Sequence, residues 1–376
     1  MRHRLLDLLV CPECGGTLAL QEYATSKDGN TVEVLEGLLT CGECARTYPV
    51  IGGIPRMLPD DLQHSLLQYH RNFFERYPHL SPTFGSGDKS PFTGGKRATY
   101  QSFSYQRIEM EPPDLRYAND WIVHFRRRIA PRQGNELAGK LGIDAGCGFG
   151  RHLYAASSFG AEVIGIDLSE GVQRAYRNNY GNPNVHVVQG DIYRMPFRPG
   201  TFDFGYSFGV LHHLPDPRRG FDSLARMVRE GGTVMVWVYG YEGMSFLYRL
   251  SHMRTLRRLT TRLPRTWQRA MCWVLAVVLE LTLWMPYRVL SRFRLTRPLA
   301  DRLPAHTNAY QPLALKATAI FDRLGTPITH FHNREELQKW FADAGMENWS
   351  VFTPDRRGWQ AGGRRTTSTL ELAKGA

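Results

Sequence analysis

Short apolar runs alternate with amphipathic segments through the middle of the chain. Four such runs cover residues 141–145, 161–167, 185–189 and 201–207, and a fifth covers 233–238. Apolar runs of this length, separated by segments of helical periodicity, are typical of strand–helix–strand units whose parallel strands are buried on both faces. The pattern therefore predicts an α/β fold with an open, mostly parallel sheet.

A long insertion interrupts this pattern, which resumes near the C-terminal end. The sequence predicts a helix over 334–344, N-capped by Asn333, and closing strands over 347–352 and 367–373. These elements complete a doubly wound sheet of seven strands. We divide the chain into four parts: a small module at 1–58, a linker and capping segment at 59–120, the α/β domain at 121–239 and 328–376, and a helical insertion at 240–327.

Three alternating glycines follow directly after the first predicted strand, where residues 144–150 read Asp-Ala-Gly-Cys-Gly-Phe-Gly. Glycine lets the backbone turn sharply and lie against a ligand, because no Cβ stands in the way. The helix predicted after this loop presents its N-terminal amides to the same ligand. The residues assigned to this nucleotide-type site are Asp144, Ala145, Gly146, Cys147, Gly148 and Gly150.

Acidic residues also end the next two predicted strands. Asp167, followed by Leu168, ends the second strand, where its carboxylate can accept hydrogen bonds from both hydroxyls of a ribose. Asp191, followed by Ile192, lies at the end of the third strand. The alternative for both carboxylates is a structural role in a turn, but acids at three successive strand ends favour a nucleotide site.

The spacing Asp-x-Gly-x-Gly-x-Gly resembles that of the Rossmann-like (class I) S-adenosylmethionine-dependent methyltransferases. The dinucleotide fingerprint would place its third glycine where Arg151 stands, which disfavours an NAD-dependent oxidoreductase. The resemblance implies S-adenosyl-L-methionine as cofactor and Asp191 as the acceptor for the adenine amino group. It also implies that Ser207, at the end of the fourth strand, lies near the transferable methyl group.

His212 and His213 follow the fourth strand and are the candidate catalytic residues. In methyl transfer an enzyme mainly orients the acceptor and removes its proton where needed, and a histidine can take that proton. The alternative is a histidine hydrogen-bonded to backbone within the turn. Upstream, Tyr105 and Gln106 are candidates for a lid over the methionine end of the cofactor, or else pack against the flank of the domain.

Two Cys-x-x-Cys pairs near the N-terminus are separated by 26 residues. They can place four thiolates tetrahedrally around a structural Zn²⁺, the alternative being unmetallated or redox thiols. The candidate metal ligands are Cys11, Cys14, Cys41 and Cys44. The surrounding sequence resembles the Trm112-like zinc-ribbon family, whose modules stabilise or activate methyltransferases. This resemblance implies a structural or substrate-facing role.

The formal net charge is +12, and most of it comes from one segment. Residues 249–297 contain eleven arginines and a single acid, Glu280, which gives +10. Charge this local argues against a diffusely basic surface that coats nucleic acid. The first residues hold only a short apolar run and no signal-peptide cleavage site, so we expect a reduced, cytoplasmic setting in which thiols can bind metal.

The same segment contains an apolar stretch, 271–285, which is interrupted only by Glu280 and Thr282. It falls short of the ~20 residues that span a bilayer. Flanking arginines and tryptophans are typical of a helix at a membrane interface, which would place residues 245–297 at the inner face of the membrane. A buried lid, a dimer contact and a membrane-spanning helix are the alternatives. After the insertion, His330 and His332 either line an acceptor pocket or belong to a hinge.

The combined patterns predict a methyltransferase that acts on a small-molecule or lipid-linked acceptor. One alternative is an RNA methyltransferase that binds its substrate through the zinc ribbon and the arginines. Against it, the arginines surround an apolar helix and do not interleave with stacking aromatics along a groove. A second alternative is a non-catalytic scaffold or activator. The three strand-end acids and the intact glycines disfavour it.

Overall fold

The computed structural model describes residues 1–28, 31–82, 93–110, 118–240, 254–300, 303, 309–353 and 358–366. An eleven-stranded sheet forms the centre of the molecule, in the order β1-β2-β3-β4-β7-β6-β5-β8-β9-β11-β10. The strands are β1 (Leu18–Asp28), β2 (Thr31–Cys41), β3 (Thr47–Ile51), β4 (Ile54–Met57), β5 (Leu141–Ala145), β6 (Glu162–Asp167), β7 (Val185–Gly190), β8 (Phe202–Phe208), β9 (Val228–Tyr239), β10 (Met346–Phe352) and β11 (Gly358–Arg365).

The predicted α/β fold is confirmed, and its seven strands are those from β7 to β10 in the sheet order. Strands β7, β6, β5, β8 and β9 pair in parallel, whereas β11 is antiparallel to both β9 and β10. The parallel strands put apolar side chains on both faces. Val163 packs toward helices α5 (Ala118–Ile129) and α6 (Arg151–Ser158), and Ile164 packs with the core on the opposite face.

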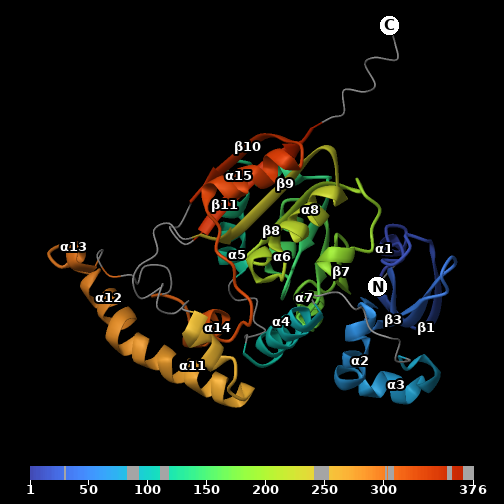
Figure 1. The fold of residues 1–376 in the computed structure, drawn as a ribbon, viewed down its shortest axis with the longest axis horizontal. Coiled ribbons are helices and arrows are strands. Elements are labelled where there is room, and N and C mark those ends of the chain that lie inside the picture. The colour runs from blue at the N-terminus through green and yellow to red at the C-terminus, as the bar shows by residue number, and fades with distance from the viewer. Residues whose placement is uncertain are drawn as a thin grey trace, which may run out of the picture.

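The sheet extends beyond the predicted seven strands because the N-terminal module joins its edge. Strand β4 pairs in parallel with β7, with Arg56 opposite Gln189 and Met57 opposite Gly190. The module and the α/β domain therefore share one sheet, and Figure 1 shows the module beside β7. The N-terminal apolar side chains, Leu5 among them, belong to the same hydrophobic core as Ile143.

The closing strand β11 lies earlier in the chain than we predicted. It covers Gly358–Arg365 and lies between β9 and β10 in the sheet. The predicted strand 367–373 lies outside the described residues. Its glycines make this segment read as a loop, but they are required by close packing. A Cβ on Gly363 would lie 2.8 Å from the Phe341 ring of helix α15 (Arg334–Asp343).

The remaining helices surround the sheet and extend below the carboxyl ends of its parallel strands (Figure 1). They are α1 (His3–Leu6), α2 (Asp60–Tyr69), α3 (Arg71–Arg76), α4 (Thr93–Tyr105), α7 (Val172–Asn178), α8 (Pro217–Met227), α10 (Arg254–Thr260), α11 (Arg265–Leu279), α12 (Met285–Leu290), α13 (Arg297–Ala300) and α14 (Leu313–Leu324). Short 3₁₀ or π turns are η1 (Pro78–Leu80), η2 (Gln106–Met110), η4 (Gly134–Leu137), η5 (Ile192–Arg194), η6 (Leu211–His213) and η7 (Glu280–Trp284).

The insertion forms a helical layer beside α4. Helix α11 continues through η7 into α12, so the helix covers residues 265–290 and exceeds the predicted 271–285. Its partner is α14, with which it forms a separate hydrophobic cluster that includes Cys272, Ala276 and Phe321. Figure 1 shows α11, α12 and α13 in orange, projecting from the body of the molecule at the lower left.

Candidate functional site

The loop after β5 requires glycine at its turns. Gly146, Gly148 and Gly150 have φ of 91°, 55° and 83°, in the left-handed region that other residues rarely adopt. Space is also short, because a Cβ on Gly146 would lie 2.4 Å from Val210 and a Cβ on Gly150 2.9 Å from the Ala175 backbone. The loop therefore places its backbone, and the start of α6, at the carboxyl edge of the sheet.

Asp167 lies beside this loop, at the end of β6. Its Oδ2 accepts a hydrogen bond of 2.8 Å from the Gly148 amide, and its Oδ1 accepts one of 2.8 Å from the Ser169 amide and one of 2.6 Å from the Ser169 hydroxyl. A carboxylate offers about four acceptor positions. Three are used here, so Asp167 keeps acceptor capacity toward the adjoining pocket.

Asp144 is buried at the end of β5. Burial, and then the charge of Asp167, raises the pKa of Asp144 well above its ordinary value. Within the described residues Asp144 belongs to no ion pair. A buried carboxyl without a salt-bridge partner is costly to ionise, and a cationic ligand would offset that cost. The sulfonium of S-adenosylmethionine has the required charge.

A pocket opens between the sheet edge and α4. The predicted residues that line it are Gly146, Asp167, Leu168, Ile192 and His213. Further lining residues that the sequence analysis missed are Thr99, Tyr100, Phe103, Arg107, Ser169, Gly209, Val210 and Leu214. The backbone of the glycine loop and the acid of β6 thus share one cavity.

The α4 face of the pocket differs from the predicted lid. Tyr105 packs against Phe321, with ring centroids 5.9 Å apart, and Gln106 donates a 3.3 Å hydrogen bond to the Thr318 carbonyl. Both residues therefore face α14. The helix face that lines the pocket carries Phe103, with Tyr100 one turn before it and Arg107 one turn after it. The helical spacing of Tyr100, Phe103 and Arg107 is the signal that could have found this face.

Asp191 meets a lysine of α4. Its Oδ1 accepts a 3.0 Å hydrogen bond from the Tyr193 amide, and its Oδ2 lies 2.9 Å from the Nζ of Lys96. Asp191 itself is outside the residues that line the pocket, whereas the next residue, Ile192, is among them. The strand-end acid is therefore shared between the turn and the capping helix.

His213 lines the pocket, and its hydrogen bonds fix its tautomer. Its Nδ1 lies 2.8 Å from the Ile328 carbonyl, which only accepts, so Nδ1 carries the proton and Nε2 carries the lone pair. Within the described part of the chain, Nε2 has no hydrogen-bond partner. Burial lowers the pKa of His213 and so favours the neutral ring. A neutral imidazole with a lone pair in a cavity can accept a proton.

Several other predicted residues lie in the core and do not line the pocket. His212 stacks on Tyr239 with ring centroids 3.9 Å apart, and its Nδ1 accepts from the Tyr239 amide. Ser207 is buried and donates a 2.7 Å hydrogen bond to the Ala145 carbonyl, which joins β8 to β5. The Cys147 side chain is buried too, beside Gly165. Of these residues Ser207 lies in β8, His212 lies in η6 and Cys147 lies in the loop after β5.

His330 and His332 follow the insertion and pack beside β9. The His332 amide donates to the Tyr239 carbonyl, and its Nδ1 lies 2.8 Å from a carboxylate oxygen of Glu336 in α15. The His330 amide donates to the His212 carbonyl. Neither residue lines the described pocket, so both serve the packing of the chain that returns from the insertion.

The four cysteines converge at one end of the N-terminal module. Their Sγ atoms all lie within 4.8 Å of one another, with Cys11 and Cys44 3.6 Å apart and Cys14 and Cys41 3.5 Å apart. Tetrahedral Zn²⁺ with Zn–S bonds of about 2.3 Å has sulfurs about 3.8 Å apart. The donor set and its spacing therefore fit a structural zinc site with no open coordination position.

A buried charge network joins this module to the cofactor side of the sheet. Arg56 of β4 lies 3.2 Å from Glu170, and both side chains are fully buried. His70, Tyr100 and Gln189 also hydrogen-bond to Glu170, which directly follows Ser169 of the pocket. Burial opposes ionisation of Glu170, but the hydrogen bond to His70 and the charge of Arg56 lower its pKa. The module, α4 and the pocket thus meet at one carboxylate.

Comparisons with known proteins agree with this geometry. Residues 143–236 match the family described as methyltransferase domain, and residues 2–53 match the family described as Trm112p-like protein. A demethylmenaquinone methyltransferase of Clavibacter sepedonicus is 33% identical over 126 residues, which are 32% of this chain and 49% of that protein. A tRNA (carboxymethyluridine(34)-5-O)-methyltransferase of Saccharomyces cerevisiae is 30% identical over 107 residues, 28% of this chain and 37% of that protein.

Among solved structures, a complex between the Haloferax volcanii Trm112 methyltransferase activator and a putative methyltransferase is similar. The match has 14% identity and a TM-score of 0.39, and it covers 72% of this chain and 97% of that one. The chain spans about half the length, or less, of the two curated relatives given above. Residues 143–236 are thus a methyltransferase domain of the S-adenosylmethionine-dependent class, and residues 2–53 are a Trm112p-like module.

Proposed function

We propose that the chain transfers the methyl group of S-adenosyl-L-methionine to a small-molecule or lipid-linked acceptor. The observation that carries this proposal is one pocket that is lined by Gly146 of the glycine loop, by Asp167 and by His213. Within it, the loop backbone and Asp167 would hold the cofactor, and Ile192 would contact its base. When bound, S-adenosylmethionine supplies an electrophilic methyl group on a sulfonium.

The chain's own contribution is to orient the acceptor and to manage its proton. The Ile328 carbonyl fixes the His213 tautomer, and Phe103 contacts the ring edge with centroids 5.2 Å apart. Nε2 of His213 would then be the atom that accepts the acceptor's proton, while the methyl carbon exchanges its bond to the cofactor sulfur for one to the acceptor. Asp144, buried at the end of β5, is not among the residues that line the pocket and is given no role in the transfer.

The proposal keeps the four-part division of the chain. Residues 1–58 form a zinc-stabilised module that supports the cofactor side, and residues 59–120 cap the pocket. Residues 121–239 and 328–376 carry the transfer reaction, and the insertion at 240–327 lies on the acceptor side. We place the protein in a reducing, cytoplasmic compartment, where four thiolates stay available to zinc.

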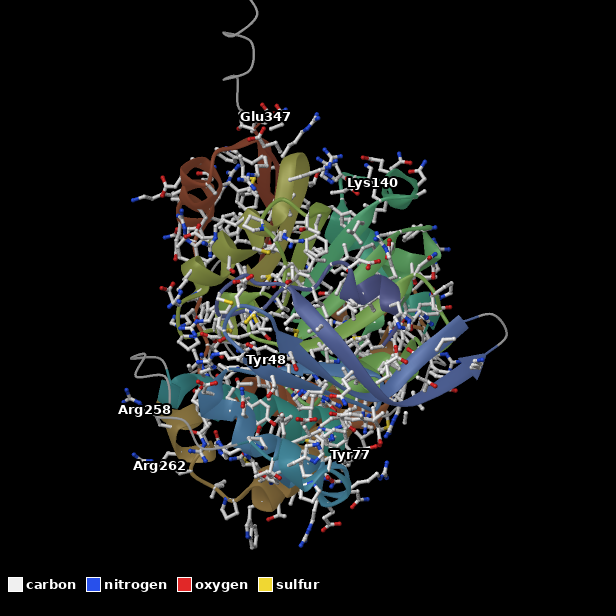
Figure 2. All side chains as sticks on the ribbon, turned by 90° about the vertical axis from the view of Figure 1, so that its right-hand side faces the viewer. Tyr48, Tyr77, Lys140, Arg258, Arg262 and Glu347 are labelled. Carbon is white, nitrogen blue, oxygen red and sulfur yellow. The ribbon has the colours of Figure 1, made fainter. Side chains whose placement is uncertain are left out.

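RNA is the second candidate acceptor. The observation in its favour is a group of exposed arginines that includes Arg258 and Arg262, together with the tRNA methyltransferase among the relatives. Figure 2 shows both arginines on the outside of the molecule, at the lower left. The same arginines also flank an exposed apolar helix, which suits a lipid-linked acceptor better than a nucleic acid.

The test uses S-adenosylmethionine with a labelled methyl group and three acceptor pools. The purified chain is incubated with a lipid extract, with total RNA and with soluble metabolites, and label is counted in each. We expect label in the lipid or metabolite pool, and we expect it to disappear in His213→Ala. Label confined to RNA would support the second candidate. Binding of S-adenosylhomocysteine with no transfer to any pool would indicate a non-catalytic scaffold.

A further inference from the structure

One face of the α11–η7–α12 helix is apolar and exposed. This helix, Arg265–Leu290, has 26 residues, and only 22% of its most apolar window is buried. It is long and apolar enough to cross a membrane, by length and composition only. Its exposed large apolar residues are Trp267, Val274, Val277, Val278, Leu281, Met285 and Val289. Apart from Val277 at the margin, their spacing of three, four and seven residues places them on one face.

The opposite face is fixed to the protein. Cys272, Ala276 and Trp284 are buried against α14, where Ala317 and Phe321 are fully buried as well. Glu280, the one acid of the segment, turns to this inner side, where Lys316 of α14 lies 2.5 Å from its Oε2 and Arg288 binds its other oxygen. The helix therefore lies along the protein and shows one apolar side to solvent.

Polar groups are nearly absent from the exposed side. Between Ala270 and Tyr287 the only exposed polar side chain is Thr282, and its hydroxyl donates a 2.7 Å hydrogen bond to the Val278 carbonyl of its own helix. Side chains as large as Val278 and Leu281 are 48% and 57% exposed. Soluble monomers rarely expose a contiguous stripe of this kind without a binding role.

Arginines stand at both ends of the stripe. Arg258 and Arg262 are exposed before α11, and Arg292, Arg294 and Arg297 are exposed after α12. A second copy of the chain, packed stripe to stripe, would bring arginine clusters together whether the helices ran parallel or antiparallel. An apolar layer edged by negative charge complements the stripe and both of its ends.

We propose that this stripe docks on the surface of a bilayer that contains anionic lipids. The helix lies in the plane of the interface, its apolar side enters the headgroup region, and the terminal arginines bind lipid phosphates. The layer that docks also supports the pocket, because Gln106 and Ser102 of the capping segment hydrogen-bond to the Thr318 and Gly325 carbonyls. Docking therefore brings the pocket close to the membrane. The inference stands on the helix and is independent of methyl transfer.

The test measures flotation of the full chain with vesicles of phosphatidylcholine, with and without phosphatidylglycerol. We expect binding to the anionic vesicles and weaker binding to neutral ones. Val278→Asp with Leu281→Asp should weaken binding about tenfold or more, because both apolar contacts are lost and charge is added. Arg292→Gln, Arg294→Gln and Arg297→Gln together should weaken it by at least about tenfold at low salt, and less at high salt.

The matched control is Val123→Asp, because Val123 of α5 is 45% exposed on a different element. It should leave vesicle binding unchanged. Failure of the wild-type chain to float with anionic vesicles would overturn the inference, and so would binding that the stripe variants retain. A dimer in solution that Val278→Asp dissociates, with no vesicle binding, would assign the stripe to a second copy instead. Affinity for S-adenosylhomocysteine, measured separately, reports on the proposed function alone.

Discussion

The Nζ of Lys96 lies 2.9 Å from the Oδ2 of Asp191, and these side chains are only 8% and 6% exposed. Lys96 belongs to α4, which lies between β4 and β5 in the chain, and Asp191 follows β7. The ion pair therefore fastens the capping helix to the sheet edge, next to Ile192 of the pocket. The positive charge on this side of the pocket, that of Lys96, therefore comes from the helical segment between β4 and β5.

We expect removal of either partner to destabilise the fold. Lys96→Met and Asp191→Asn should each lower the free energy of unfolding by about 3 kcal/mol, because each leaves the other group buried without its partner. The double variant should lose clearly less than the sum of the two. Urea denaturation of the four proteins measures this coupling. Strictly additive losses would show that the pair is not coupled.

Asp167 should control cofactor affinity. Asp167→Ala removes a carboxylate that faces the pocket, and we expect affinity for S-adenosylhomocysteine to fall roughly 10- to 100-fold by titration calorimetry. Asp203→Ala is the matched control. Like Asp167, Asp203 accepts a 2.8 Å hydrogen bond from a backbone amide, that of Leu141, but Asp203 lies near the start of β8, away from the carboxyl ends of the strands. Equal affinities for the two variants would remove Asp167 from the cofactor site.

The parts that could be predicted from sequence share a local cause. The strand–helix alternation, the glycine turn and the four-cysteine cluster all follow from residues close together in the chain. The positions at which the structure differs from the prediction depend on contacts between residues that are far apart in the chain. Whether Tyr105 or Tyr100 faces the pocket is decided by α14, which occupies one side of α4. Helical spacing groups Tyr100, Phe103 and Arg107 on one face, but the local sequence does not say which face of the helix α14 will cover.

The N-terminal module illustrates the same limit. The convergence of its four cysteines could be predicted from spacing, but its pairing with β7 could not, because β4 is only Ile54–Met57. An arginine is ordinarily expected at the surface, yet Arg56 is only 2% exposed. Its guanidinium is paired with the carboxylate of Glu170, more than a hundred residues away in the chain. Likewise, the Gly-rich strand β11 reads as a loop until Phe341 is seen packed against it.

Buried histidines should make the fold sensitive to mild acid. Burial lowers the pKa of His124, His152 and His213 below the ordinary value of 6.5. The unfolded chain then binds more protons than the folded chain as pH falls through 6.5, so stability is full above that pH and is lost below it. Each histidine contributes up to about 1.4 kcal/mol per pH unit.

The variant His152→Gln isolates one of these contributions. It removes a titrating ring that contacts His124 at 3.2 Å, while it keeps a polar side chain. Between pH 7 and 5, the free energy of unfolding should fall less steeply with pH in the variant than in the wild type. The difference between the two slopes should be up to about 1.4 kcal/mol per pH unit, the contribution of one histidine. Denaturant titrations at several pH values give both slopes. Parallel curves would contradict this assignment of the acid sensitivity.

Loss of zinc should weaken cofactor binding at a distance. Chelation, or Cys41→Ser, should remove the zinc that we propose the four-cysteine cluster holds, and with it a source of the module's stability. The β4–β7 pairing then loosens, and Glu170, next to Ser169 of the pocket, loses Arg56. We expect one zinc per native chain by atomic absorption, and weaker S-adenosylhomocysteine binding after its loss. Arg56→Met should keep the zinc but should also weaken S-adenosylhomocysteine binding, because it removes the Arg56–Glu170 ion pair directly. Unchanged affinity in a zinc-free chain whose helix content is intact would show that the module does not support the cofactor side.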